Sequence, residues 1–214
     1  RSARSGGGQR GGRAGANSYV RNFAGSGGGG GAAALVELGA GAYFASNSCV
    51  GPSGDGGGLG GAGTVSASNC VFVGNSASRQ GGGLFQGVAA YNCLFDGNSA
   101  TNAAGLGGGV SFTPVYGCVF AGNSSPLAPA IGNARAAVNC TIVGHTNPVP
   151  PVAFTNAHVF ANNVLWSNAS NEVYNTTNAF NNSTNDPVFL GDPLYPWKLA
   201  EASPCVDAGD DAFV

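Results

Sequence analysis

Short apolar runs recur along the chain, separated by polar and glycine-rich stretches. The clearest copy spans residues 70–84 and reads CVFVGNSASRQGGGL, and residues 93–110 repeat it as CLFDGNSATNAAGLGGGV. Each copy has a polar anchor three residues after an aromatic or aliphatic residue, and the anchors are Asn22, Asn47, Asn75, Asn98, Asn123, His145 and Asn168. Their spacing of 22 to 28 residues is typical of a solenoid, in which each repeat contacts only its neighbours.

Each copy predicts two very short β-strands. A β-type run such as 71–73 is followed by the turn Gly-Asn-Ser, a glycine-rich bend and a second run such as 84–85. Runs this short do not form stable hairpins alone, but parallel stacking about 4.8 Å apart would join them into continuous sheets. We therefore predict an all-β fold, a right-handed parallel β-helix (solenoid) of about seven to eight rungs, whose hand follows the rule for parallel crossovers.

The same pattern divides the chain into three regions. Residues 1–16 form a Gly/Arg-rich arm, residues 17–170 the β-helix repeat array, and residues 171–214 a C-terminal capping segment. An arm of this composition is a solvated tail in an isolated molecule, and we expect a neighbouring subunit to order it. The glycine triplets stop after the array, and residues 186–211 are expected to cover the last rung.

Equivalent positions in successive repeats predict ladders inside the coil. The aromatic position gives a stacked hydrophobic row of Tyr19, Phe44, Phe72, Phe95, Phe120, Ile142 and Leu165. Because this row lies between Cys and Asn on a periodic inner face, core packing is favoured over a surface for stacking sugars. The asparagine anchors predict a ladder of side-chain amides. The glycine triplets allow turns to approach closely, and no Gly-Lys-Ser/Thr follows them, which excludes a phosphate loop.

Composition and charge narrow the class of protein. Gly and Pro supply 49 of 214 residues, a level near that of disordered chains, but their fixed place in each repeat indicates turns. Only 8% of residues are charged and the net charge is −2, so no nucleic-acid partner is expected. Basic residues gather at the head and acidic ones at the tail, and the predicted assembly residues are Arg1, Arg4, Arg10, Arg13, Asp207, Asp210 and Asp211.

Other features predict secretion. The chain has no Met, six Cys and several Asn-x-Ser/Thr sequons, and we expect a mature extracellular or cell-surface protein whose signal peptide has been removed. No run of 18 apolar residues exists, so no membrane span is expected. The chain would be a glycoprotein, with Asn175, Asn181 and Asn182 the favoured acceptors, because Asn123 and Asn168 are needed in the asparagine row.

Four cysteines precede their anchors by five residues and therefore stack in one column: Cys70, Cys93, Cys118 and Cys140. They are either reduced and packed as small apolar residues, or joined as Cys70–Cys93 and Cys118–Cys140, which the secretory signals favour. Ligands in a line cannot surround zinc tetrahedrally. Cys49 and Cys205 lie near opposite ends of the predicted rod. They could link stacked molecules, or they are two separate thiols.

The paired motifs resemble a known repeat family. Phe-x-x-Asn occurs at 44–47, 72–75, 95–98 and 120–123, and Gly-Gly-aliphatic steps occur at 57–59, 82–84 and 108–110. These resemble the polymorphic outer-membrane protein repeat, with its FxxN and GGA(I/L/V) motifs, although a third Gly replaces Ala here. Residues 203–209 (SPCVDAG) resemble the end segment of secreted right-handed β-helix repeat proteins. The resemblance implies a surface or extracellular protein and supplies no catalytic residues.

Three functions follow as hypotheses. The favoured one is a non-enzymatic structural subunit of a filament, appendage or surface coat that polymerises head to tail. The alternative is an adhesion or carbohydrate-binding passenger domain that recognises surface glycans. A polysaccharide lyase or hydrolase would need clustered catalytic groups. The candidates are scattered over different rungs, so neither enzymatic activity nor a metal or cofactor is expected: Glu37, Asp55, Arg79, Asp96, Arg135, His145 and His158.

Overall fold

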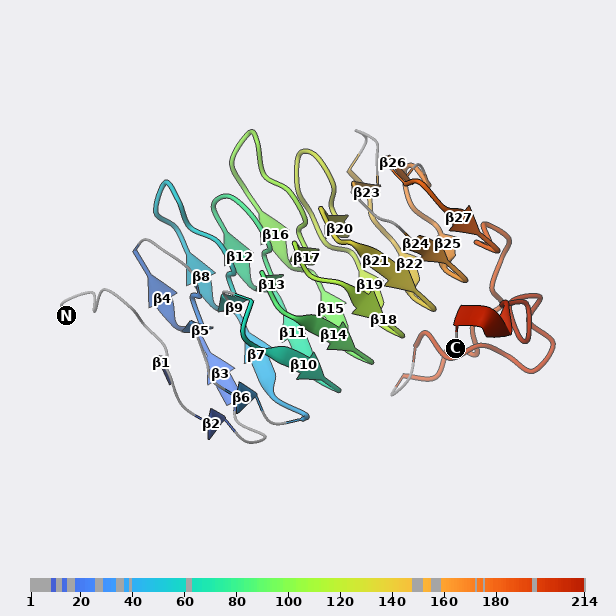
Figure 1. The fold of residues 1–214 in the computed structure, drawn as a ribbon, viewed down its shortest axis with the longest axis horizontal. Coiled ribbons are helices and arrows are strands. Elements are labelled where there is room, and N and C mark those ends of the chain that lie inside the picture. The colour runs from blue at the N-terminus through green and yellow to red at the C-terminus, as the bar shows by residue number, and fades with distance from the viewer. Residues whose placement is uncertain are drawn as a thin grey trace.

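Parallel strands stacked turn upon turn form the whole fold. The computed structural model describes residues 9–10, 13–14, 18–25, 29–33, 37–38, 40–60, 63–147, 152–154, 159–171, 173–174, 176–193 and 196–213. Over these residues the protein is an all-β solenoid of about six turns, slightly fewer than predicted, with the N-terminal turns at one end of the stack and the C-terminal turns at the other (Figure 1). The helical element of the described chain is the short 3-10 turn η1 (Asp211–Phe213).

The first face, which we call the aromatic sheet, carries the predicted hydrophobic row. Its strands are β3 (Ser18–Val20), β7 (Tyr43–Ala45), β11 (Val71–Val73), β15 (Leu94–Asp96), β19 (Val119–Ala121), β22 (Thr141–Val143) and β25 (Val164–Trp166). The parallel register places Tyr19, Phe44, Phe72, Phe95 and Phe120 directly above one another. Their rings stack with centroids 4.6–4.9 Å apart and planes within 6°. The predicted core ladder is confirmed.

The chain then turns onto a smaller face, the serine sheet, which covers the first turns. Its strands are β4 (Phe23–Ala24), β8 (Ser48–Cys49), β12 (Ser76–Ala77) and β16 (Ser99–Ala100). A small side chain points inward from each of these strands, namely Ala24, Cys49, Ala77 or Ala100, and all four are buried. The serines of the same strands are partly exposed or outward-facing.

After the glycine-rich bend the chain forms the longest face, the glycine sheet. Its strands are β1 (Gln9–Arg10), β5 (Ala32–Ala33), β9 (Leu59–Gly60), β13 (Leu84–Phe85), β17 (Val110–Ser111), β20 (Ile131–Gly132), β23 (Ala153–Phe154) and β26 (Val173–Tyr174). Glycine is required before these strands: a Cβ at Gly57 or Gly82 would lie 2.4 Å from the carbonyl oxygen of Gly82 or Gly108 in the next turn.

The fourth face, the tyrosine sheet, leads back to the aromatic sheet. Its strands are β10 (Ser66–Ser68), β14 (Ala89–Tyr91), β18 (Val115–Tyr116), β21 (Ala136–Val138), β24 (Val159–Ala161) and β27 (Ala179–Phe180). Tyr91 and Tyr116 stack on its outer surface with ring centroids 5.2 Å apart. The corner that follows needs a left-handed residue, with φ between 49° and 60°, and uses Asn69, Asn92, Gly117, Asn139, Asn162 and Asn181.

Part of the predicted N-terminal arm belongs to the solenoid. β1 pairs in parallel with β5, and β2 (Arg13–Ala14) pairs with β6 (Glu37–Leu38). The next turn of the same chain therefore pairs with these four residues, and a contact of the arm with a neighbouring subunit stays a prediction. Arg1 and Arg4 lie outside the described residues.

The coil also extends past the predicted boundary at residue 170. β26 and β27 continue two sheets, and Ser183 bridges to Val164. The remaining segment folds back beside the last turns (Figure 1). There Phe189 bridges Leu199 and packs edge-on against Trp197, with ring centroids 5.6 Å apart. The side chain of Asn162 holds this segment by one hydrogen bond from the N–H and one to the C=O of Asp210, both 3.0 Å long.

Candidate functional site

A column of polar side chains, the asparagine ladder, runs through the corner between the aromatic and serine sheets. It consists of the seven predicted anchors from Asn22 to Asn168. In five of the six steps an amide oxygen accepts the backbone N–H of the previous anchor, as from Asn75 to Asn98 at 3.0 Å. The amide nitrogen donates to a core carbonyl, as from Asn98 to Phe72 at 2.9 Å. Because the central rungs are fully buried and fully hydrogen-bonded, this ladder is a structural element.

His145 replaces asparagine in one rung. Its Nδ1 lies 2.9 Å from Oδ1 of Asn168, and its Nε2 lies 3.4 Å from Nδ2 of Asn123. An amide oxygen only accepts, so Nδ1 carries the proton and Nε2 accepts from Asn123. This arrangement requires the neutral imidazole. Burial lowers the pKa of His145 to about 4, although the hydrogen bond with Asn168 opposes that shift.

The cysteine column, Cys70, Cys93, Cys118 and Cys140, lies at the next corner, where the tyrosine sheet meets the aromatic sheet. The backbone N–H of Cys70 donates to Sγ of Cys93 at 3.4 Å, and Cys93 donates in the same way to Cys118. Asparagines continue the column: Oδ1 of Asn163 accepts the N–H of Cys140 at 2.9 Å, and Asn182 accepts that of Asn163. At this corner a thiol or an amide oxygen therefore accepts the backbone N–H of the previous turn. Asn163 precedes its anchor by five residues, as the cysteines do, and this spacing alone would have placed it in the column.

All six cysteines lie in the described part of the chain, and none forms a disulfide there. Of the two states predicted for the column, the structure holds the reduced one, and the Cys70–Cys93 and Cys118–Cys140 bridges stay a prediction. The hydrogen bond with Cys118 and burial raise the pKa of Cys93 to about 12, despite opposing hydrogen bonds with Cys70. Such thiols are poor nucleophiles and metal ligands at neutral pH.

The two cysteines outside the column have different environments. Cys49 is fully buried between Ala24 and Ala77, and burial raises its pKa to about 11. Cys205 is partly exposed, with Sγ 3.5 Å from Oγ of Ser183. A link from Cys49 to Cys205 of another molecule would require the second turn to open, because the Cys49 sulfur has no exposed surface in the fold.

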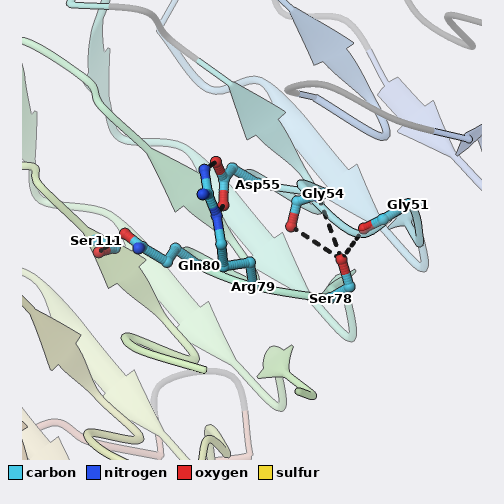
Figure 2. Close-up of polar contacts among 7 residues, drawn as sticks. All are labelled: Gly51, Gly54, Asp55, Ser78, Arg79, Gln80 and Ser111. Carbon is cyan, nitrogen blue, oxygen red and sulfur yellow. Dashed lines mark hydrogen bonds and ion pairs between the residues drawn. The ribbon is translucent and has the colours of Figure 1, made fainter. Parts of the chain in front are cut away.

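A second cluster of polar contacts lies on and beside the loops that precede the glycine sheet (Figure 2). Nε of Arg79 donates to Oδ1 of Asp55 at 2.9 Å, and a second guanidinium nitrogen contacts Oδ2. This pair raises the pKa of Arg79. Ser78 accepts the N–H of Gly54 and donates to the C=O of Gly51, and Ser111 donates to Gln80. The carboxylate of Asp55 is bound on both oxygens and buried, so this cluster fastens two turns together.

The candidate catalytic groups are not brought together in the described residues. Asp55 and Arg79 meet each other, but Asp96 lies on the outer surface of the aromatic sheet and His145 lies inside the asparagine ladder. Partial burial raises the pKa of Asp96. The described chain holds no group of three His, Cys, Asp or Glu residues positioned for a metal ion. His158 and the side chain of Glu37 lie outside what the structure describes.

The predicted glycan acceptors differ in exposure. Asn181 is exposed at a corner with φ 49°. The amide of Asn182 is already used, since it accepts from Asn163 and donates to the carbonyl of Phe160 at 2.8 Å. Asn123 is buried in the asparagine ladder, as expected. Asn175 lies outside the described residues.

The predicted assembly groups lie at the two ends of the chain. Asp207, Asp210 and Asp211 are exposed on the C-terminal segment. The backbones of Arg10 and Arg13 belong to the first turn. Exposed apolar side chains accompany both ends: Val20 and Phe23 in the first turns, and Tyr174 and Phe180 in the last. No helix in the described chain is long and apolar enough to cross a bilayer.

Among the described residues, two depressions lie on the side of the solenoid. One of about 490 Å³ lies where the serine sheet ends and is lined by Ser99, Ala100, Thr101, Ser124, Ser125, Pro126, Thr146 and Asn147. The other, of about 360 Å³, lies where the glycine sheet turns into the tyrosine sheet, and it includes a cation, Arg135, and an exposed ring, Phe112. Neither depression was predicted from the repeat pattern.

Comparisons were made with protein-family models, curated proteins and solved structures. None of the three gave a match. The stacking of parallel turns is thus established by the structure, and the resemblance to the polymorphic outer-membrane protein repeat rests on the motifs of the chain itself. The chain is a parallel β-solenoid repeat protein.

Proposed function

We propose that this chain is a non-enzymatic extracellular structural protein, a solenoid subunit that stacks head to tail in a filament, appendage or surface coat. Kinship with the polymorphic outer-membrane protein repeat and a secretory route are parts of this proposal. One observation carries it. The aromatic, glycine and tyrosine sheets all run through the last turns, and in the described chain the end strands β3 of the aromatic sheet and β27 of the tyrosine sheet each pair with one strand only.

The two ends of the solenoid can form hydrogen bonds with each other. An edge strand presents unpaired N–H and C=O groups that can pair with another chain. The first strand of a copy can continue the sheet that the last strand of another copy leaves open. A head-to-tail contact of this kind does not close on itself and therefore grows into a fibre.

Side chains at the two ends support the same contact. Val20 and Phe23 are 47% and 46% exposed in the first turns, and Tyr174 and Phe180 are 45% and 44% exposed in the last. Burying them between copies would contribute favourably to assembly. The acidic tail and the basic head would add electrostatic attraction, which makes assembly sensitive to salt.

The test is negative-stain microscopy and sizing of the purified chain. The double variant Val20→Lys with Phe23→Lys changes two exposed side chains and should fold as well as the native chain. We expect fibres from the native chain, weakened by high salt, and monomers from the double variant. Leu127→Lys is the matched control, since Leu127 is 44% exposed on a loop in the middle of the array.

A stable monomer at high concentration would contradict the filament and favour the adhesive passenger domain. The same samples with and without reductant test the predicted disulfides. If the thiols are reduced, as the structure has them, reductant should change neither assembly nor the melting temperature. Loss of a native bridge would instead cost about 2–4 kcal/mol of stability.

A further inference from the structure

The smaller depression is a groove made of two parallel rows of side chains. One row follows strands β13, β17 and β20 of the glycine sheet, and the other precedes strands β14, β18 and β21 of the tyrosine sheet. The first row consists of the left-handed corner residues Gln86, Phe112 and Asn133, and the second consists of Val88, Pro114 and Arg135. Successive members of each row come from successive turns, so the groove runs along the solenoid axis.

Phe112 is the unusual member of the first row. Its φ is +54°, in the left-handed region that a bulky side chain rarely adopts. The ring is 43% exposed, so burial does not compensate the strain, although its edge meets Phe85 at a centroid distance of 6.0 Å. Asparagine occupies the same corner position one turn later, at Asn133. The corner needs a left-handed residue in each turn, and at Phe112 that residue presents an exposed aromatic ring to the groove.

Arg135 supplies the charge. It is exposed, and neither an ion pair nor a side-chain hydrogen bond joins its guanidinium to the described chain. Arg79, by contrast, is engaged by Asp55. The amide of Gln86, on the facing row, is exposed as well. The groove thus combines an open cation, an open amide and the face of an aromatic ring.

We propose that this groove binds an extended acidic glycan, one built from uronic acid residues. Phe112 packs against the apolar face of a sugar ring, Arg135 binds a uronate carboxylate through two parallel N–H donors, and Gln86 contacts hydroxyl groups. The volume of about 360 Å³ is at the lower end of that of small-molecule sites and accepts a short stretch of the glycan. A single cation is too little for a nucleic-acid backbone, which requires several phosphate contacts.

Binding is tested on the full chain by isothermal titration with three probes: a short oligogalacturonate, maltohexaose as a neutral sugar, and a short polyglutamate peptide as a non-sugar polyanion. We expect the oligogalacturonate to bind about tenfold more tightly than the neutral sugar, the factor expected for one charge-assisted contact. The peptide should not bind.

Two variants identify the residues. Phe112→Asn should relieve strain at the corner, leave the melting temperature unchanged or higher, and weaken oligogalacturonate binding about tenfold. Arg135→Gln should remove the preference for the charged sugar. Lys198→Gln, which removes an exposed cation elsewhere, should change nothing. The proposal fails if the native chain shows no saturable binding of oligogalacturonate, if polyglutamate binds equally well, or if both variants bind like the native chain.

Discussion

The asparagine ladder and the cysteine column occupy the two corners that flank the aromatic sheet, and each supplies one side chain per turn. In the ladder, amide oxygens accept backbone N–H groups at 2.9–3.0 Å. In the column, thiols accept them at 3.4 Å and donate to carbonyls at 3.3–3.5 Å. At both corners the side chain accepts a backbone N–H and donates to a carbonyl, and the shorter distances in the ladder indicate stronger hydrogen bonds than in the column.

The largest effect is expected from breaking the asparagine ladder at its centre. Asn98→Leu keeps the size of the side chain but leaves the N–H of Asn75 and the carbonyl of Phe72 buried without their partner. Each unsatisfied group costs about 1–3 kcal/mol, so we expect a loss of about 4 kcal/mol. Urea denaturation of the variant and the native chain measures this loss in the free energy of unfolding. A loss below that of a cysteine-column variant would contradict the ranking of the two corners.

A second effect is expected from acid at His145. Its pKa in the folded chain is about 4, below its ordinary value of 6.5. Above pH 6.5 both the folded and unfolded states are neutral here, so the full stability is present. As the pH falls toward 4 the unfolded state takes up the proton first, and about 3 kcal/mol is lost. Below pH 4 the loss levels off.

The variant His145→Asn isolates the contribution of the imidazole to the pH dependence of stability. It restores the amide of the other rungs and should remove the loss, while the carboxylates of the chain titrate alike in both proteins. The measurement is the difference in unfolding free energy between the variant and the native chain from pH 7.5 to pH 4. A constant difference over that range would show that the imidazole does not limit acid stability.

The smallest effect is expected in the cysteine column. Cys93→Ala removes a weak acceptor and a weak donor and should cost about 1 kcal/mol. Cys93→Asn should recover part of that loss, because Asn163 and Asn182 already occupy this corner in later turns. The melting temperatures of the two variants and the native chain test this prediction. If asparagine is worse than alanine at position 93, thiol and amide are not equivalent here.

The stacked rows were predictable because identical residues repeat at a fixed interval. The ring ladder from Tyr19 to Phe120 and the amide ladder both follow from that interval alone. The pair of Asp55 and Arg79 was not predictable, because it depends on how the longest repeat, from Asn47 to Asn75, folds its extra residues. The groove was missed for another reason: it depends on the left-handed backbone of Phe112, and no residue preference predicts a phenylalanine there.

The ladders also make the solenoid a one-dimensional chain of couplings. Each turn is stabilised by its contacts with the turn before and the turn after. The unfolding of the array is therefore only as cooperative as its weakest contact between neighbouring turns. We expect the weakest junction at His145, where one imidazole joins two asparagines and the stacked phenyl rings give way to Ile142 and Leu165. We therefore expect the first turns and the last ones to unfold as two units at low pH, where the protonation of His145 weakens the contact between them.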